Sequence, residues 1–208
     1  FEALEQRILP ELLLSKQELP LRIWVAGCAT GEEAYSLAIS LQDLMVKHQL
    51  SDRQVKIFAT DVHRGSLDRA ARAIYDAEAV AKVTPERLER YISRIGNTYQ
   101  VVPDLRQMIV FASHNVIKDA PFTRVDLVSC RNMLIYLQPA AQQKALSLFH
   151  FSLVRGGVLF LGPSESAGGL TPDFETVDKQ WRVYRKHTDV RTPLFGVSNQ
   201  IAAGWTGF

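Results

Sequence analysis

The stretch RIWVAGCATGEE, Arg22 to Glu33, decides how this chain of 208 residues folds. Its first part, Arg22 to Cys28, is a short apolar run bounded by small residues, which predicts a buried parallel strand. Three small residues follow, and a helical pattern then runs from Glu32 to about His48. A strand, a tight turn and a helix therefore follow one another near the start of the chain.

Apolar runs and helical patterns go on alternating beyond this stretch. Several of the runs are apolar on both faces, as are strands that lie between two layers of helices. The pattern therefore predicts an α/β domain in which helices cover both faces of a mostly parallel sheet. The further predicted strands are residues 55–61, 99–102, 108–112, 125–130, 158–162 and 182–185, and the further predicted helices are residues 1–14, 65–73 and 139–153, the last ended by Gly156-Gly157.

One segment, residues 74–107, interrupts the alternation and predicts a small insert that contains β-structure. Within it, Thr84 and Pro85 open a helix as N-cap and first helical residue, and Gly96-Asn97 forms a turn. Residues 193–208 have the composition of a weakly ordered tail. We therefore expect a single domain over residues 1–192, with the insert inside it.

The composition is that of a globular protein with its own core, since 47% of the residues are hydrophobic. No apolar run approaches the ~20 residues that a membrane helix needs. With a net charge of +2 and no long Lys/Arg block, nothing favours nucleic-acid binding. The sequence begins without an initiator methionine or a signal peptide, so we expect part of a longer cytoplasmic protein. Cys28 and Cys130 are expected to be buried thiols, and no histidine has metal-ligand spacing.

The first candidate binding feature is the turn from Ala26 to Glu33. Backbone N–H groups at the start of a helix are open to a ligand, and small residues let the ligand approach closely. The turn lacks the Lys-Ser/Thr of a Walker A loop and the GxGxxG of a dinucleotide site. Glu32 and Glu33 would repel phosphate and favour a cationic ligand. A plain tight turn with acids at the helix start is the alternative.

The second feature is Asp61, which closes the predicted strand 55–61. An acid at this place can accept hydrogen bonds from both hydroxyls of a ribose, although a helix-capping aspartate would look the same. Together, the glycine turn and this acid predict a nucleoside-like ligand across the strand ends. The positive sulfonium and ammonium groups of S-adenosylmethionine suit the acidic turn better than the phosphates of NAD do.

The third feature is CRNMLIY, Cys130 to Tyr136, at the end of another buried strand. Methyltransferases that act on the amino groups of bases typically have an (Asn/Asp)-Pro-Pro-(Tyr/Phe) turn here, whereas this chain has Arg131. A guanidinium group recognises a carboxylate, either on a substrate or on the methionine part of the cofactor. Tyr136 could face the sulfonium. A structural salt bridge of Arg131 and a core position for Tyr136 are the alternatives.

These features occur together in one known family, because the chain resembles the catalytic domain of the bacterial chemotaxis receptor (CheR) methyltransferases. The resemblance runs from about Phe1 to Lys186, and the CRNxxIY element is more specific than the glycine turn. It is closest to versions found in multidomain proteins that also carry a methylesterase-like unit and PAS modules. The segments that carry it are AGCATGEEAYSLAI (26–39), FATDV (58–62), ASHNVI (112–117), SCRNMLIYL (129–137) and LFHFSLVRGGVLFLGPSES (148–166).

The resemblance implies a Rossmann-like, S-adenosylmethionine-dependent methyltransferase sheet with a small β-containing insert. It also implies a reaction in chemotactic signal transduction, in which the methyl group passes to glutamate side chains of chemoreceptor-type proteins and S-adenosylhomocysteine is left. A glutamate has a pKa of about 4.3 and is already ionised at neutral pH. The reaction therefore needs no general base, and the sequence offers no candidate for one.

The resemblance assigns roles to individual residues. Gly27 and Glu33 would contact the methionine part of the cofactor, and Asp61 would bind the ribose hydroxyls. Asn115 would bind the adenine amino group, with the backbone of Val116 beside it.

At the other end of the cofactor, Arg131 and Tyr136 would line the place where methyl donor and acceptor meet, and Asn132 would join Arg131 in contacting the cofactor. Two features differ from the family. Its Phe-Phe-Arg-(Asp/Glu) element, whose arginine helps to hold the cofactor, stands upstream of the first helix and is not in this sequence. The turn from Ile95 to Thr98 is short, which argues against tethering through a receptor tail peptide.

Two other functions stay open beside the protein-glutamate methyltransferase. One is a signalling module that binds S-adenosylmethionine or a partner without turnover. The other is a methyltransferase for small molecules or nucleic acids, which the lack of an (Asn/Asp)-Pro-Pro turn disfavours.

Overall fold

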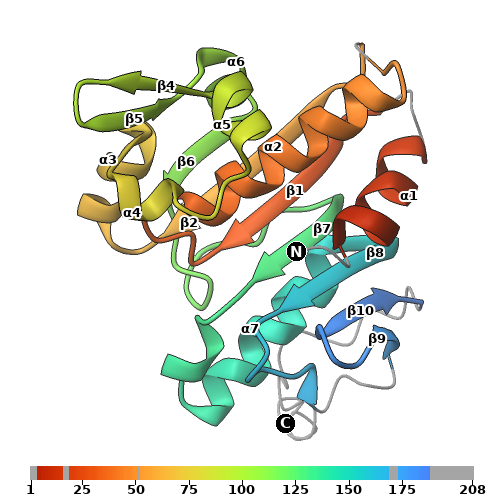
Figure 1. The fold of residues 1–208 in the computed structure, drawn as a ribbon. Helices are drawn as coiled ribbons and strands as arrows, with labels where there is room; N and C mark the ends of the chain where they lie inside the picture. Colours follow the sequence, from red (N-terminus) through yellow and green to blue (C-terminus); the bar gives the residue numbers. More distant parts are fainter. Residues whose placement is uncertain (1–3, 16–18, 51, 169–172, 188–208) are drawn as a thin grey trace, which may run out of the picture.

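The computed structural model describes residues 4–15, 19–50, 52–168 and 173–187, and Figure 1 shows their fold. The expected tail, residues 193–208, lies outside the described residues. Among the helices of the described part, none is long and apolar enough to cross a membrane.

A seven-stranded sheet forms the centre of the domain, with the strand order β6-β2-β1-β7-β8-β10-β9. The first five strands in this order are parallel, whereas β10 pairs antiparallel with both β8 and β9. From β1 the chain first adds strands on one side and then returns to add β7 and β8 on the other. The strands are β1 (Leu21–Ala26), β2 (Val55–Asp61), β6 (Ile109–Ser113), β7 (Val125–Cys130), β8 (Leu153–Leu161), β9 (Phe174–Asp178) and β10 (Val183–Lys186).

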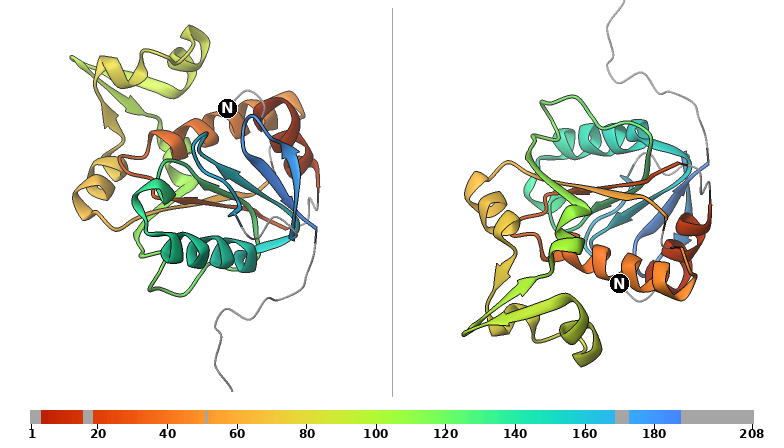
Figure 2. Two further views of the ribbon diagram at one scale, coloured as in Figure 1. Left: turned by 90° about the horizontal axis from the view of Figure 1, so that it is seen from below. Right: turned by 90° about the horizontal axis from the view of Figure 1, so that it is seen from above.

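Helices cover both faces of this sheet, so the domain has three layers (Figure 2). One face carries α1 (Leu9–Leu14) and α2 (Glu32–Lys47), and the opposite face carries α7 (Pro139–Ser152). A π-helical turn, Leu4–Ile8, precedes α1, so the described part of the predicted first helix is confirmed.

The side chains of β1 pack alternately into the hydrophobic cores on the two faces of the sheet. Ile23 and Val25 belong to the hydrophobic core under α1 and α2, whereas Trp24 and Ala26 belong to the core under α7. All four side chains are at most 1% exposed. The predicted α/β class, with helices on both faces of a mostly parallel sheet, is therefore confirmed.

The buried indole of Trp24 links β1 to its neighbour. Its Nε1 donates a hydrogen bond of 2.9 Å to the hydroxyl of Thr60 on β2, and both side chains are at most 1% exposed. The indole also meets the rings of Phe122 and Phe149 edge to face, at 5.1 and 5.2 Å between centroids. A polar group in the core is thus paired, as a buried N–H must be.

A second, three-stranded antiparallel sheet has the order β3-β5-β4 and lies within the expected insert. Thr84 caps α5 by accepting a hydrogen bond from the Arg87 amide, with Pro85 at the first turn as predicted. The expected turn at Gly96-Asn97 is present, with a φ of +60° at Gly96, whereas the strand that precedes it was not predicted. The insert contains β3 (Ile74–Tyr75), α4 (Ala77–Val80), α5 (Pro85–Tyr91), β4 (Ile92–Ile95), β5 (Thr98–Val101) and α6 (Pro103–Gln107), and α3 (Arg64–Arg72) precedes it.

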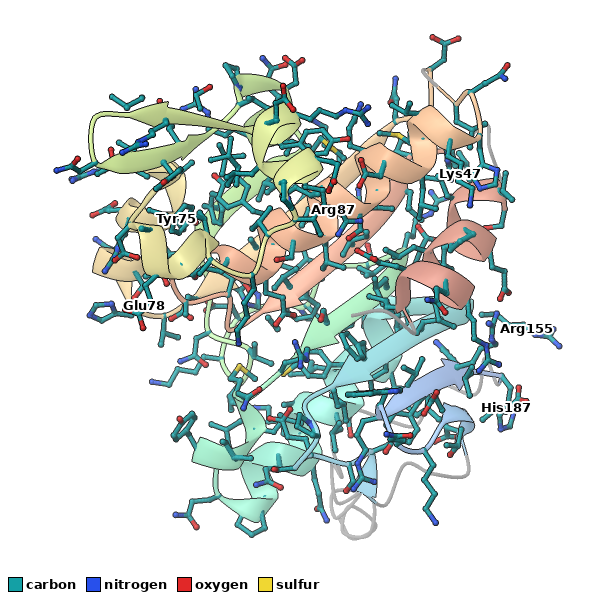
Figure 3. The ribbon with its side chains drawn as sticks, in the orientation of Figure 1. Lys47, Tyr75, Glu78, Arg87, Arg155 and His187 are labelled. Carbon is teal, nitrogen blue, oxygen red and sulfur yellow. The ribbon has the colours of Figure 1, made fainter. Side chains whose placement is uncertain are left out.

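A charged network attaches this sheet and its helices to the main domain (Figure 3). The Arg87 guanidinium donates to Asp43 of α2 at 2.8 Å and to Glu5 of the first turn at 3.0 Å. The hydroxyl of Tyr91 donates to the same Asp43 at 2.6 Å. Three segments far apart in the sequence therefore meet at the guanidinium group of Arg87.

The prediction that Gly156-Gly157 ends α7 is wrong. The helix already ends at Ser152, and β8 runs through both glycines. Gly156 has a φ of +80°, and a Cβ at Gly157 would lie 2.8 Å from the carbonyl oxygen of Val154. The glycines therefore serve an irregularity of β8, where its register with β7 shifts. A helix end and an irregular position in a strand both require a positive φ or free space that only glycine offers. The sequence alone could therefore not distinguish these two roles.

We predict that Thr60→Val destabilises the domain. The substitution preserves the shape of the side chain but leaves the Trp24 indole N–H buried without an acceptor, which costs about 1–3 kcal/mol. Urea unfolding followed by tryptophan fluorescence measures the change. Thr176→Val on the exposed edge strand is the matched control, and an equal free energy of unfolding for the two variants would contradict the prediction.

Candidate functional site

The candidate residues gather at one edge of the main sheet, where β1, β2, β6 and β7 end. These four strands are neighbours and run parallel, so their carboxyl ends lie side by side. The chain changes direction between β1 and β7, and ligands of open α/β sheets bind outside the strand ends at such a point.

The turn after β1 is shaped by two glycines and by β2. Gly27 and Gly31 have φ values of +73° and +92°, a backbone conformation that residues other than glycine rarely adopt. The amides of Gly27 and Cys28 both donate to the carbonyl oxygen of Thr60, at 2.8 and 2.9 Å. A Cβ on Gly27 would lie 3.0 Å from the side chain of Met133, so Met133 packs directly on this turn.

Asp61 at the end of β2 binds this turn directly. Its Oδ2 accepts from the amide of Ala29 at 2.9 Å, and its Oδ1 accepts from the amide of His63 at 2.9 Å. The N-cap of α3 is His63, so the alternative that Asp61 caps this helix is wrong. Because each carboxylate oxygen has two lone pairs, the partly exposed Asp61 retains one acceptor position on each oxygen.

Glu33, in the first turn of α2, reaches across to β7. The hydroxyl of Ser129 donates to its Oε1, and Nη1 of Arg131 lies 3.9 Å from its Oε2. Burial raises the pKa of Glu33, while the hydrogen bond from Ser129 and the charge of Arg131 act in the opposite direction. The side chain retains 20% exposure, so a partly buried carboxyl group lies at the edge of the predicted site.

Glu33 and Phe160 both lie close to the guanidinium group of Arg131. Besides the 3.9 Å approach to Glu33, its guanidinium carbon lies 5.0 Å from the ring centre of Phe160 on β8. The ion pair is long, and the side chain keeps 27% exposure. Arg131 thus combines the structural salt bridge, which was the alternative interpretation, with an exposed part that can meet a ligand.

Glu165 holds the turn that carries Arg131, and the sequence analysis missed it. This carboxylate is 4% exposed and accepts from the amides of Asn132 at 3.1 Å, Leu134 at 2.7 Å and Gly162 at 2.7 Å. Asn132 has a φ of +60°, a strained backbone that these bonds stabilise. The available signal was an acid soon after the buried strand β8, at the same sheet edge.

Tyr136 does not lie in the core. It is 82% exposed on a 3₁₀ turn, Leu134–Tyr136, so the alternative of a core tyrosine is wrong. Within the described residues, the side chain of Tyr136 makes no hydrogen bond. The structure leaves its hydroxyl to solvent.

Asn115 follows β6, next to the end of β2. Its Oδ1 accepts hydrogen bonds from the backbone N–H groups of Ile117 at 3.0 Å and Lys118 at 3.2 Å. The backbone N–H of Asn115 itself donates to the carboxylate of Asp119 at 2.7 Å. Both lone pairs of Oδ1 are therefore used, and the side-chain NH2 is the group left for a ligand. Val116 beside it is 7% exposed and packs into the core under α7.

The small insert also touches the site. The hydroxyl of Tyr75, labelled in Figure 3, donates to the carbonyl oxygen of Thr30 at 2.8 Å. Its ring packs edge to face against Tyr35 of α2. Burial raises the pKa of Tyr75, so this hydroxyl is a permanent donor that fixes the turn after β1.

Cys28, between the two glycines of the turn, is a buried and free thiol, as is Cys130. Burial and the charge of Asp61 raise the pKa of Cys28 to about 12. The thiol stays protonated at neutral pH and is a poor nucleophile. The expectation of two buried structural thiols is confirmed.

We predict that Glu165→Gln destabilises the domain by about 2 kcal/mol, because a neutral amide loses charge-assisted hydrogen bonds and turns an NH2 towards a backbone N–H. Chemical unfolding measures this change. Glu89→Gln, on the exposed face of α5, is the control. Equal losses in the two variants would show that the turn does not depend on Glu165.

Comparison with known proteins shows the family of this chain. The family model described as CheR methyltransferase, SAM binding domain, matches residues 1–183. A chemotaxis protein methyltransferase 1 of Pseudomonas aeruginosa is 37% identical over 182 residues, covering 85% of this chain and 66% of that protein.

Two further relatives extend the comparison. A chemotaxis protein methyltransferase of Listeria monocytogenes is 36% identical over 165 residues, covering 79% of this chain and 61% of that protein. A 104.1 kDa protein encoded in the hypE 3' region of Rhodobacter capsulatus is 42% identical over 174 residues, covering 84% of this chain but 18% of that protein. The chain thus spans less than two thirds of the length of these three relatives. It belongs to the CheR methyltransferase family and corresponds to that family's S-adenosylmethionine-binding domain.

Proposed function

We propose that this domain binds S-adenosylmethionine at the carboxyl edge of β1, β2 and β7 and transfers its methyl group to glutamate side chains of chemoreceptor-type proteins. The observation that carries this proposal is the hydrogen bond between Asp61 and the Ala29 amide, which joins the acid and the glycine turn in one place. Glu33 and Arg131 complete the same edge.

The residues present suit a cationic nucleoside. Asp61 retains acceptor positions for ribose hydroxyls, and Glu33 contributes a second negative charge where the methionine part would lie. Asn115 and Val116 stand at the neighbouring strand end, where the adenine would lie. With Oδ1 of Asn115 occupied, its NH2 would donate to a ring nitrogen rather than accept from the adenine amino group.

For the acceptor, the chain supplies a guanidinium and an exposed tyrosine. Arg131 would orient the anionic glutamate, with Asn132 and Tyr136 on the same turn beside the reacting groups. The methyl carbon forms a bond to a carboxylate oxygen as its bond to sulfur breaks, and the electron pair stays on sulfur as S-adenosylhomocysteine leaves. Because opposite charges neutralise each other, exclusion of water favours the reaction. The protein's main task is alignment, which can supply roughly 7–11 kcal/mol at most.

The proposal extends to the context of the domain. We place residues 1–192 in one catalytic domain with residues 74–107 as a subdomain, acting in the cytoplasm. Fused methylesterase-like and PAS units would suit the match to only 18% of a 104.1 kDa relative.

A second function is a signalling module that binds S-adenosylmethionine or a partner without turnover. Methyl-labelled S-adenosylmethionine and a chemoreceptor, mixed with the full-length protein, separate the two functions. Label on the receptor that alkali releases as methanol marks a glutamyl ester. Alkali-stable label would indicate N-methylation, and unlabelled receptor despite cofactor binding would favour the module without turnover.

We predict that Asp61→Asn weakens binding of S-adenosylhomocysteine at least tenfold, about 1.4 kcal/mol, because a charged acceptor for the ribose is lost. Isothermal titration calorimetry on the full-length protein measures the dissociation constant. Asp68→Asn, exposed on α3, should bind as the wild type does. Equal affinity of the Asp61 variant and the wild type would refute the ribose assignment.

We predict that Arg131→Lys lowers the rate of methyl transfer about a hundredfold, because an ammonium cannot replace a planar, bidentate guanidinium in orienting a carboxylate. Single-turnover labelling of the receptor measures the rate, and calorimetry measures cofactor affinity in parallel. A variant that loses affinity and rate by the same factor would show that Arg131 serves the cofactor alone.

A further inference from the structure

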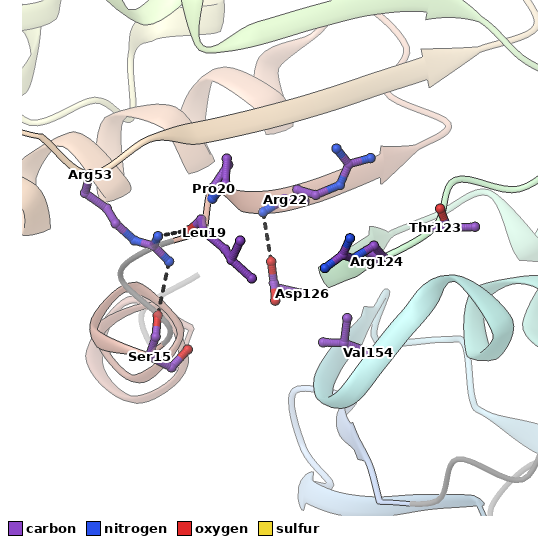
Figure 4. Close-up of a pocket in the computed structure, with 9 residues that line it drawn as sticks. All are labelled: Ser15, Leu19, Pro20, Arg22, Arg53, Thr123, Arg124, Asp126 and Val154. Carbon is purple, nitrogen blue, oxygen red and sulfur yellow. Dashed lines mark hydrogen bonds between the residues drawn. The ribbon is translucent and has the colours of Figure 1, made fainter.

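A second pocket lies at the opposite edge of the main sheet, where β1 and β7 begin (Figure 4). Its volume is about 370 Å³, within the range of pockets that hold small molecules. Three of its lining side chains are arginines and one is an aspartate, so its walls carry excess positive charge. The lining residues are Ser15, Leu19, Pro20, Arg22, Arg53, Thr123, Arg124, Asp126 and Val154.

Arg53 forms the fixed wall of this pocket. It is 9% exposed, and its guanidinium donates to the carbonyl oxygens of Leu13 at 3.2 Å, Ser15 at 3.1 Å and Leu19. These bonds join Arg53 to the end of α1 and to Leu19, close to the start of β1. Arg53 is therefore a structural cation whose charge still acts on the pocket.

Arg22 differs from Arg53 because its side chain lacks such acceptors. Its guanidinium lies over the ring of Phe58, 4.8 Å from the ring centre. Its Nε is buried and has no hydrogen-bond acceptor among the described residues. The backbone amide of Arg22 donates to Asp126 at 2.9 Å, so this carboxylate is engaged by the main chain. Because this Nε is shielded from solvent, only the terminal Nη groups of the Arg22 guanidinium can meet a ligand.

Arg124 lines the same pocket as Arg22 and is exposed. Its φ of +59° is unusual for a residue with a side chain. Within the part of the chain that the structure describes, its side chain makes no ion pair or hydrogen bond. In the view of Figure 4, Arg22 and Arg124 lie on one side of Asp126 and Arg53 on the other.

We propose that this pocket binds the phosphate group of a small phosphate ester. Two guanidinium groups from different segments, Arg22 and Arg124, match the several oxygens of a phosphate better than a single cation does. The hydroxyl of Thr123 is a further donor, and Leu19 and Val154 offer apolar surface to the organic part of the ligand. The site is separate from the S-adenosylmethionine site, because it lies at the opposite ends of β1 and β7.

Thermal unfolding of the full-length protein, titrated with glycerol 3-phosphate at constant ionic strength, tests the proposal. A ligand that binds the folded state raises the melting temperature saturably. We expect such a rise for the wild type and an apparent dissociation constant at least about tenfold weaker for Arg22→Gln and for Arg124→Gln. Arg72→Gln, an exposed arginine of α3 outside the pocket, should respond as the wild type does.

The exposed Arg124 keeps the test decisive even if Arg22→Gln unfolds. Glycerol should have no effect, and acetate should bind more weakly than the phosphate ester. The proposal is overturned if the Arg124 variant responds as the wild type does, if the rise never saturates, or if acetate matches the phosphate ester. Binding at the S-adenosylmethionine site would not imitate the expected result, since that site carries Glu33 and Asp61 and its response would not depend on Arg124.

Discussion

The carboxylate of Asp61 is the interaction on which the rest of the site depends. By accepting from the amides of Ala29 and His63, it joins the turn after β1 to the turn after β2. Both turns consist of backbone that a strand no longer pairs, so a side chain must satisfy their N–H groups. The same carboxylate keeps acceptor positions for a ligand. Under the proposed function, the turns and the ligand would both depend on this one group at the end of a buried strand.

A second carboxylate holds backbone N–H groups on the other side of the point between β1 and β7 where the chain changes direction. Glu165 holds the amides of Asn132, Leu134 and Gly162, and so fixes the turn that presents Arg131. Glu33 then reaches Arg131 from α2. Acidic side chains at strand ends therefore organise both halves of the edge, and the field they create there favours a cation. At the opposite edge of the sheet positive charge is in excess, because the pocket there is lined by three arginines and one aspartate.

Much of this could be predicted from the sequence, because local patterns report burial. The apolar strands and the glycine turn followed from residue type and spacing, and Asp61 followed from its place at a strand end. Long-range hydrogen bonds have no such local pattern. The role of Glu165 depends on amides some thirty residues away, and the exposed Tyr136 sits in an apolar run that looked like core. Gly156-Gly157 could serve a helix end or an irregular strand, and only the pairing of β8 with β7 decides.

The most direct test of the central claim is a crystal structure of the protein with S-adenosylhomocysteine. The account predicts electron density for the nucleoside outside the ends of β1 and β2, with the ribose hydroxyls at about 2.5–3.0 Å from the Asp61 carboxylate. Met133 would then lie beside the ligand, whether it keeps its contact with Gly27 or moves away from it. Density for the nucleoside at any other place, or a ribose with no contact to Asp61, would contradict it.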